Sequence, residues 1–122
     1  MKTVVVIGAS QNPVKFGNKA VRAFVDAGYN VVPINPKGGQ IGDLQVLGSV
    51  GEVETRPDIM SAYLPPALLL QQLPDIARLG CDELWINPGA GSAEVQEEAL
   101  RLDLKPINTC SILRIGKSPS EY

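Results

Sequence analysis

Residues 4–17, VVVIGASQNPVKFG, join a run of β-branched residues to a glycine-containing turn. A continuous apolar run of this kind is typical of a strand that is buried on both faces of a parallel sheet. Gly8 follows the run directly, and a helical pattern, NKAVRAFVDAG, begins at Asn18. The stretch therefore predicts a strand, a tight loop and a helix in immediate succession.

The alternation of strand and helix continues along the chain. Further strands are predicted at residues 29–36, 57–65, 82–89 and 105–113, and further helices at 67–80 and 92–103. Pro74 is expected to kink the helix of 67–80 or to start a second short helix. The glycine-rich residues 37–50 predict a loop with a short extended piece, and residues 49–56 a short, weak helix.

This alternation indicates right-handed βαβ crossovers and a parallel sheet. We predict an α/β fold, namely a Rossmann-like three-layer α/β/α domain over residues 1–115. Its five-stranded parallel sheet is expected in the order 3-2-1-4-5, with a ligand site at the carboxyl ends of the strands, between strands 1 and 4. Residues 116–122 are polar and are expected to form a loosely held tail.

Composition and charge narrow the classes of function. The chain has 122 residues, of which 44% are hydrophobic and 20% charged, and its formal net charge is −2. These values are ordinary for one soluble domain and indicate no general attraction to nucleic acid or to an acidic membrane. No run reaches the roughly 20 apolar residues of a membrane span, and the N-terminal run is too short for a signal peptide. A cytoplasmic protein is expected.

The chain contains no histidine. This absence excludes Ser–His and Cys–His nucleophile pairs, phosphohistidine chemistry and histidine metal ligands. The two cysteines, Cys81 and Cys110, form no CxxC pair, so neither a disulfide scaffold nor a zinc site is predicted. The acidic run at residues 94–98 is interpreted as a solvated helix face. We predict no catalytic residue and no metal ligand.

The loop after the first strand is a candidate phosphate site. Backbone N–H groups in a strand–loop–helix turn, together with the helix N-terminus, suit a phosphate or diphosphate. A nicotinamide dinucleotide fingerprint would need glycines at positions 10 and 13, where this chain has Ser10 and Pro13. Just after the second strand, where NAD prefers an acidic residue, this chain has Lys37. A lysine there suits a phosphate on the adenosine ribose, which both NADP and coenzyme A carry.

These motifs resemble the small CoA-binding proteins, a domain that also forms the N-terminal part of the succinyl-CoA synthetase α subunit. The family patterns are approximately V-G-A-S-x-x-P-x-x-x-G and G-Y-x-V-x-P-V-N-P-[KR]. The stretches LWINPGAGSAEVQEEAL and INTCSIL are similar to later family segments. The resemblance implies a Rossmann-like fold that binds coenzyme A. The implied ligand-binding residues are Gly8, Ala9, Ser10, Pro13 and Lys15 in the first loop, Asn35, Pro36 and Lys37 after the second strand, and Asn87 and Gly89 after the fourth.

Three assignments keep two interpretations each. Lys15 and Lys37 either meet a ligand phosphate or are solvated surface residues. Gly89 and Gly91 either open a second backbone nest that faces Gly8 or merely form a turn with positive φ. Cys110, near the end of the fifth strand, is either a thiol able to exchange with a ligand or, as we prefer, a small buried apolar residue.

The expected function is the binding of coenzyme A or an acyl-CoA, without evident catalytic machinery and without nucleic-acid or membrane partners. One alternative is an NADP-binding oxidoreductase. Another is a subunit of an acyl-CoA ligase that a partner protein completes, and a homo-oligomer is also compatible with the sequence. Succinyl-CoA synthetase chemistry would need a phosphohistidine and a nucleotide-binding part, so the resemblance implies binding and not catalysis.

Overall fold

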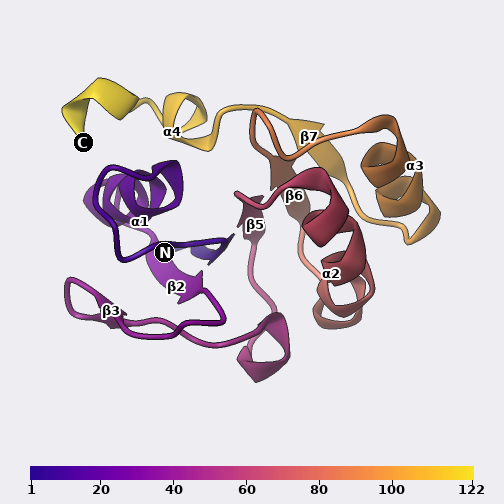
Figure 1. Ribbon diagram of the computed structural model, residues 1–122, viewed down its shortest axis with the longest axis horizontal. Helices are drawn as coiled ribbons and strands as arrows, with labels where there is room; N and C mark the ends of the chain where they lie inside the picture. The colour runs from indigo at the N-terminus through magenta and orange to yellow at the C-terminus, as the bar shows by residue number, and fades with distance from the viewer.

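The computed structural model describes residues 1–122, which form a central parallel sheet between two helical layers (Figure 1). The five sheet strands are β1 (Thr3–Ile7), β2 (Asn30–Ile34), β5 (Ile59–Ala62), β6 (Glu83–Ile86) and β7 (Pro106–Asn108). The helices are α1 (Phe16–Asp26), α2 (Pro66–Leu79), α3 (Ala93–Arg101) and α4 (Ser111–Arg114). The predicted α/β class and five-stranded parallel sheet are confirmed.

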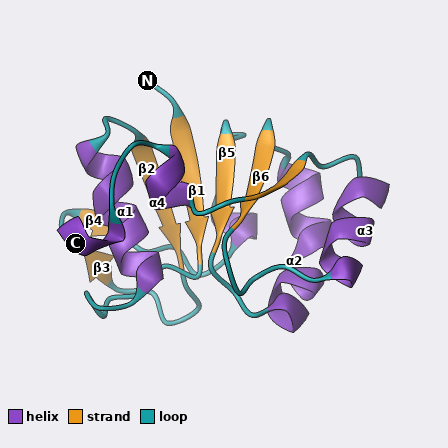
Figure 2. Ribbon diagram, turned by 90° about the horizontal axis from the view of Figure 1, so that it is seen from above, coloured by secondary structure: helices purple, strands orange, loops and turns teal.

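The helices cover both faces of the sheet, with α1 and α4 on one side and α2 and α3 on the other (Figure 2). Alternate residues of β1 enter two separate cores because successive side chains of a strand point to opposite faces. Val4 and Val6 pack with Phe24 of α1, whereas Val5 and Ile7 pack with Leu69 of α2. The predicted three layers are thus confirmed.

The predicted strand order is wrong. The observed order is β2-β1-β5-β6-β7, so the third predicted strand pairs with β1 and not with β2. In terms of the five predicted strands the order is 2-1-3-4-5, and the switch point lies between the first and third strands. Pro33 gives the physical reason. An interior strand donates backbone N–H groups to a neighbour on each of its two sides, and a proline has no N–H to donate on the side that it faces.

The geometry around Pro33 shows that its nitrogen faces the outer edge. Asn35, two residues further on and therefore on the same side, donates its backbone N–H to the Leu47 carbonyl at 2.9 Å. Leu47 in turn donates to the Pro33 carbonyl at 2.9 Å. A short segment thus covers the edge of β2 where a full strand was predicted.

The segment between β2 and β5 contains a two-stranded hairpin, β3 (Gln40–Ile41) and β4 (Leu44–Gln45), and a 3₁₀ turn at Val50–Glu52. The predicted extended piece and short helix are therefore both present. The helix α2 runs unbroken through Pro74, so no second helix starts there. In α3, Ser92 is the N-cap, and its Oγ accepts a hydrogen bond from the Val95 N–H at 3.1 Å.

Two expectations near the C-terminus are corrected. The predicted fifth strand ends at Asn108, and Ser111–Arg114 are helical, because the Arg114 N–H returns to the Cys110 carbonyl at 3.0 Å. The last residues are not loosely held. Ser118 caps a 3₁₀ turn at Pro119–Glu121, and the Tyr122 hydroxyl donates to Asp26 of α1 at 2.9 Å.

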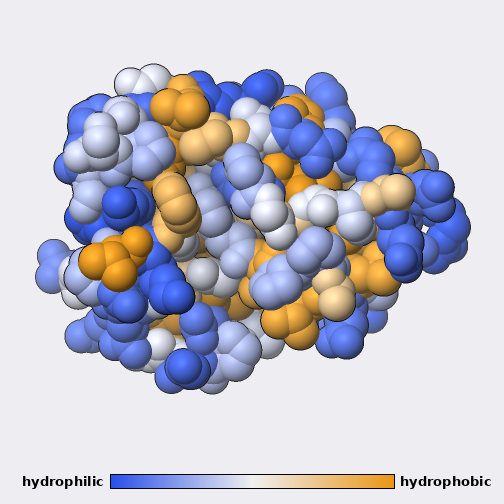
Figure 3. Space-filling view, turned by 45° about the horizontal axis from the view of Figure 1, so that its top comes forward, coloured by the Kyte–Doolittle hydropathy of each residue, from blue (hydrophilic) through white to orange (hydrophobic).

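The surface mixes polar and apolar groups. On the face shown in Figure 3, apolar residues lie in several patches separated by polar ones. None of the helices combines the length and the apolar character that crossing a bilayer requires.

Candidate ligand-binding site

The first loop, residues 8–15, lies at the carboxyl end of β1 beside the end of β5. The Tyr63 N–H donates to the Ile7 carbonyl at 2.8 Å, and this contact brings the two strand ends together. Gly8 turns with a φ of +88°, and a Cβ at this position would stand 2.6 Å from the Tyr63 carbonyl oxygen. The sharp turn expected at Gly8 is therefore present, and only glycine fits it.

Hydrogen bonds join the first loop to the turn after β2. Both the Gly8 and the Ala9 N–H groups donate to the Ile34 carbonyl, at 3.1 and 3.0 Å. The Asn35 Nδ2 donates to the Ala9 carbonyl at 2.6 Å, while its Oδ1 accepts from the Lys37 N–H at 2.9 Å. The two motifs form one structural unit, in which the polar groups of Asn35 bond to the protein itself.

Gln11 connects the first loop to the glycine-rich segment that follows. Its Nε2 donates to the Gly38 carbonyl and its Oε1 accepts from the Gln40 N–H, both at 3.4 Å. Gly39 leaves space for this side chain, because a Cβ at that position would meet the Gln11 carboxamide at 2.3 Å. Sequence analysis did not single out Gln11.

In the first loop and the first turn of α1, four backbone N–H groups have no acceptor in the protein: those of Ser10 and Gln11 in the loop, and those of Phe16 and Gly17 in the helix. The Ser10 Oγ accepts from the Asn12 N–H at 3.1 Å, which leaves its hydroxyl hydrogen free to donate. Unpaired N–H groups at a helix N-terminus attract anions. The donors offered to a ligand are thus these groups and not the N–H groups of Gly8 and Ala9.

Two exposed lysines flank these donors. Lys15 is the N-cap of α1, and Lys37 lies in the turn after β2. Neither ammonium group takes part in any of the four ion pairs of the structure. Pro13 and Pro36 are also exposed, so the two loops present their outer surfaces to solvent.

Among the predicted ligand residues, Ala9 and Asn87 are buried, at 0% and 2% exposed, and Asn87 is held by its side chain. Its Nδ2 donates to the Ser61 Oγ at 3.1 Å and to the Ala62 carbonyl at 2.9 Å, and its Oδ1 accepts from the Ser111 N–H at 2.8 Å. The Ser61 and Ser111 hydroxyls are themselves 2.8 Å apart. The Asn87 side chain therefore ties the start of α4 to β5 and has no free polar atom.

Gly89 lies in an exposed turn with a φ of +91°, closed by the Ala90 N–H donating to the Asn87 carbonyl at 2.9 Å. A hollow of about 320 Å³ is lined by residues 86–89 and 91 together with Asn108 and Thr109. No residue of the first loop lines this hollow. The two glycine loops thus border different hollows.

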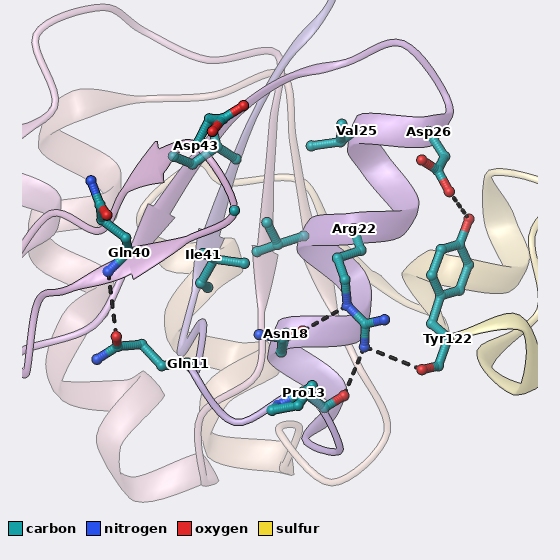
Figure 4. Close-up of a pocket in the computed structure, with 13 residues that line it drawn as sticks. Gln11, Pro13, Asn18, Arg22, Val25, Asp26, Gln40, Ile41, Asp43 and Tyr122 are labelled. Atoms are coloured by element: carbon teal, nitrogen blue, oxygen red, sulfur yellow. Dashed lines mark hydrogen bonds between the residues drawn. The ribbon is translucent and has the colours of Figure 1, made fainter.

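A groove of about 720 Å³ lies between α1 and the β3–β4 hairpin, on the α1 side of the first loop (Figure 4). Gln11 and Pro13 belong both to its lining and to the loop. Asn18 and Arg22 of α1 also line it, and sequence analysis missed both. Their signal was available, because two polar residues at i and i+4 lie on one helix face beside the loop.

One tyrosine and two cysteines near the sheet are titratable groups that are buried or half-buried. The Tyr63 hydroxyl is buried with no hydrogen-bond partner, and burial raises the pKa of this phenol above its ordinary value. Cys110 is a half-buried free thiol that precedes α4. Cys81 is buried, and burial raises the pKa of its thiol to about 11.

Comparison with known proteins identifies relatives of this chain. The α subunit of ADP-forming acetate–CoA ligase I from Pyrococcus furiosus is 29% identical over 114 residues, which cover 88% of this chain and 24% of that subunit. The YneT protein of Bacillus subtilis is 28% identical over 105 residues, which cover 83% of this chain and 72% of that protein. The chain thus spans about a quarter of the ligase subunit.

Solved structures share the fold. A conserved hypothetical protein from Pyrococcus furiosus superposes with a TM-score of 0.85 and 27% identity, covering 93% of this chain and 99% of that one. The dinucleotide-forming acetyl-coenzyme A synthetase 1 of Ca. Korarchaeum cryptofilum, in complex with phosphate and ADP, has a TM-score of 0.76 and 24% identity, over 88% of this chain and 25% of that one.

The family model described as "CoA binding domain" matches residues 2–116, which is nearly the whole chain. The resemblance inferred from the glycine loop and the Asn35–Pro36–Lys37 motif is thereby confirmed. This chain belongs to the CoA binding domain family.

Proposed function

We propose that the protein binds coenzyme A or an acyl-CoA at the carboxyl edge of the sheet, as a binding module without a catalytic role. One observation carries the proposal. In a member of the CoA binding domain family, four unpaired N–H groups of the first loop and the first turn of α1 lie beside two lysines that form no ion pair. Such an edge suits a ligand with several phosphates.

Each part of the site has a proposed task. The Ser10 and Gln11 N–H groups, the Ser10 hydroxyl and the first turn of α1 donate to the diphosphate. Gly8 forms the floor, because its lack of a side chain allows close approach, and the fully buried Ala9 supports the loop from beneath through its N–H bond to Ile34. Lys37, or Lys15, meets the 3′-phosphate as a point charge.

The loop after β6 has a supporting task in this proposal. Asn87 contributes by shaping the loop, since its side-chain atoms bond within the protein. Gly89, in its exposed turn, offers backbone contacts to the pantetheine arm.

Calorimetric titration of the whole protein with CoA, dephospho-CoA, NADP and NAD tests the proposal. CoA is expected to bind most tightly. It carries both a diphosphate and a 3′-phosphate, and the chain belongs to the CoA binding domain family. Tighter binding of NADP than of CoA would contradict the proposal and favour an oxidoreductase-type dinucleotide site.

The similarity to a ligase α subunit favours a second candidate function, in which this chain supplies the CoA site of an assembly. Because these residues span 24% of that subunit, the remaining activity would have to come from outside them. Tagged protein captured from its native host and assayed for ADP-forming acyl-CoA synthesis tests this candidate. Full CoA binding by the protein alone, with no ligase activity in the captured material, would count against it.

A further inference from the structure

A buried amide holds the first loop from behind. Asn18 lies in the first turns of α1 and is 4% exposed. Its Nδ2 donates to the Ser10 carbonyl at 2.7 Å, and its Oδ1 accepts from the Arg22 Nε at 2.7 Å. The bond from Arg22 leaves the Asn18 carboxamide a single orientation, in which its NH₂ group faces the loop.

Arg22 is fixed in turn by three elements (Figure 4). Its Nη2 donates to the Pro13 carbonyl at 2.7 Å and to the Tyr122 carbonyl at 3.2 Å. Its guanidinium also lies over the Tyr122 ring, 5.7 Å from the ring centroid, and the Tyr122 hydroxyl donates to Asp26. The rigid guanidinium fork thus spans the loop, α1 and the C-terminal turn.

These bonds set the direction of the loop donors. The structure contains no cis peptide bond, and in a trans peptide the C=O and the following N–H point in opposite directions. Because Asn18 draws the Ser10 carbonyl toward α1, the Gln11 N–H of the same peptide unit must point away from α1. That N–H is one of the four without a protein acceptor.

We propose that Asn18 and Arg22 are positioning residues that preorganise the first loop for a diphosphate, with Tyr122 holding Arg22 in place. They touch loop carbonyls, while the Gln11 N–H that they direct faces away from α1. This inference rests on the proposed function, since it assumes that the loop accepts a phosphate group. It extends that function to residues on α1 that none of the family motifs includes.

The charge of Arg22 is a competing explanation, because a cation near the loop would attract any anion. Arg22→Lys separates the two effects. It keeps the charge but loses the planar fork that reaches Asn18 and Pro13 together. Arg78→Lys is the matched control, since Arg78 is an exposed helical arginine on α2, paired with Asp75.

The experiment titrates wild type, Arg22→Lys and Arg78→Lys with CoA, inorganic pyrophosphate and adenosine 3′-monophosphate. NMR spectra record the backbone amide signals of Ser10, Gln11 and Gly17 in each protein. For Arg22→Lys, affinity for CoA and for pyrophosphate is expected to fall about tenfold, as for one or two lost charge-assisted hydrogen bonds. The Gln11 amide signal should shift, and affinity for adenosine 3′-monophosphate should stay unchanged.

The outcomes separate this inference from the proposed function. Wild-type affinity for pyrophosphate in Arg22→Lys, or an equal loss for all three ligands, would overturn the positioning role. If wild type binds pyrophosphate but not CoA, the CoA proposal fails, and the pyrophosphate titration still decides the role of Arg22. If wild type binds neither, both proposals fail.

Discussion

The Asn35 side-chain nitrogen lies 2.6 Å from the Ala9 carbonyl oxygen, so one amide joins two loops that the sequence marks separately. The oxygen of the same amide accepts the Lys37 N–H at 2.9 Å. Asn35 therefore fixes the position of the Lys37 backbone relative to the glycine turn. These two hydrogen bonds account for the role of Asn35 in the motif without any direct contact to a ligand.

Asn35→Asp tests this arrangement, because aspartate keeps the acceptor for Lys37 but cannot donate to Ala9. The free energy of unfolding, measured by urea denaturation, is expected to fall by about 1–3 kcal/mol, since the Ala9 carbonyl loses its donor and faces a carboxylate. Asn30→Asp is the control: Asn30 is exposed, and its bond to Thr3 is 3.2 Å long. Equal losses in both variants would show that the bond to Ala9 has no special weight.

Gly17→Ala tests the contact between α1 and the first loop. A Cβ at Gly17 would stand 2.3 Å from the Gly8 carbonyl oxygen, which is backbone and cannot move aside cheaply. Although alanine favours helix by about 1 kcal/mol, the clash is expected to lower stability by about 1–3 kcal/mol net and to weaken CoA binding. The matched variant Gly51→Ala, which meets nothing closer than 3.6 Å, should stay within about 0.5 kcal/mol of wild type in thermal unfolding. A Gly17→Ala protein as stable as wild type would contradict this account.

Much of the fold could be predicted from local patterns, because each buried strand is a short apolar run and each of the three longer helices has an apolar face. Strand order could not be derived from such patterns, since right-handed crossovers permit both 3-2-1-4-5 and 2-1-3-4-5. Pro33 contained the missing information. Its lack of an N–H on the outer side disfavours a full strand there, and only the short segment at Leu47 pairs with that side of β2.

The candidate site, like the fold, could be predicted from the sequence only in part. Sequence patterns located both loops, because Gly8 needs a positive φ and Asn35, Pro36 and Lys37 form a turn. They could not show which N–H groups stay free, since the bonds from Gly8 and Ala9 to Ile34 depend on the pairing of β1 with β2. The burial of Asn87 was equally hidden, because its partners Ser61 and Ser111 come from distant segments.

Lys37→Ala tests the proposed contact with the 3′-phosphate. Affinity for CoA is expected to fall by about 1–3 kcal/mol, while affinity for dephospho-CoA stays nearly constant, as calorimetry of both ligands would show. Lys2→Ala is the matched control, an exposed lysine without an ion pair that precedes β1 at the opposite edge of the sheet. Equal losses for the two ligands would show that Lys37 does not contact the 3′-phosphate.

Cys81 predicts a pH dependence of stability. Burial raises the pKa of its thiol from an ordinary value of 9.0 to about 11 in the folded protein. Between these values the unfolded chain releases the thiol proton and the folded chain keeps it. Stability due to this group is therefore fully present below pH 9, falls as the pH rises, and is lost above pH 11. The total loss is about 3 kcal/mol.

Comparison with Cys81→Ala isolates this effect, because the variant retains Tyr63, whose raised pKa acts in the same direction at higher pH. Urea denaturation at pH 7, 9, 10 and 11 is expected to show a constant difference in unfolding free energy between the proteins up to pH 9. Above it, wild type should lose stability faster than Cys81→Ala. Parallel curves from pH 9 to 11 would mean that the Cys81 thiol ionises as readily in the folded protein as in the unfolded chain, and that its burial on the α2 side of the sheet does not exclude water.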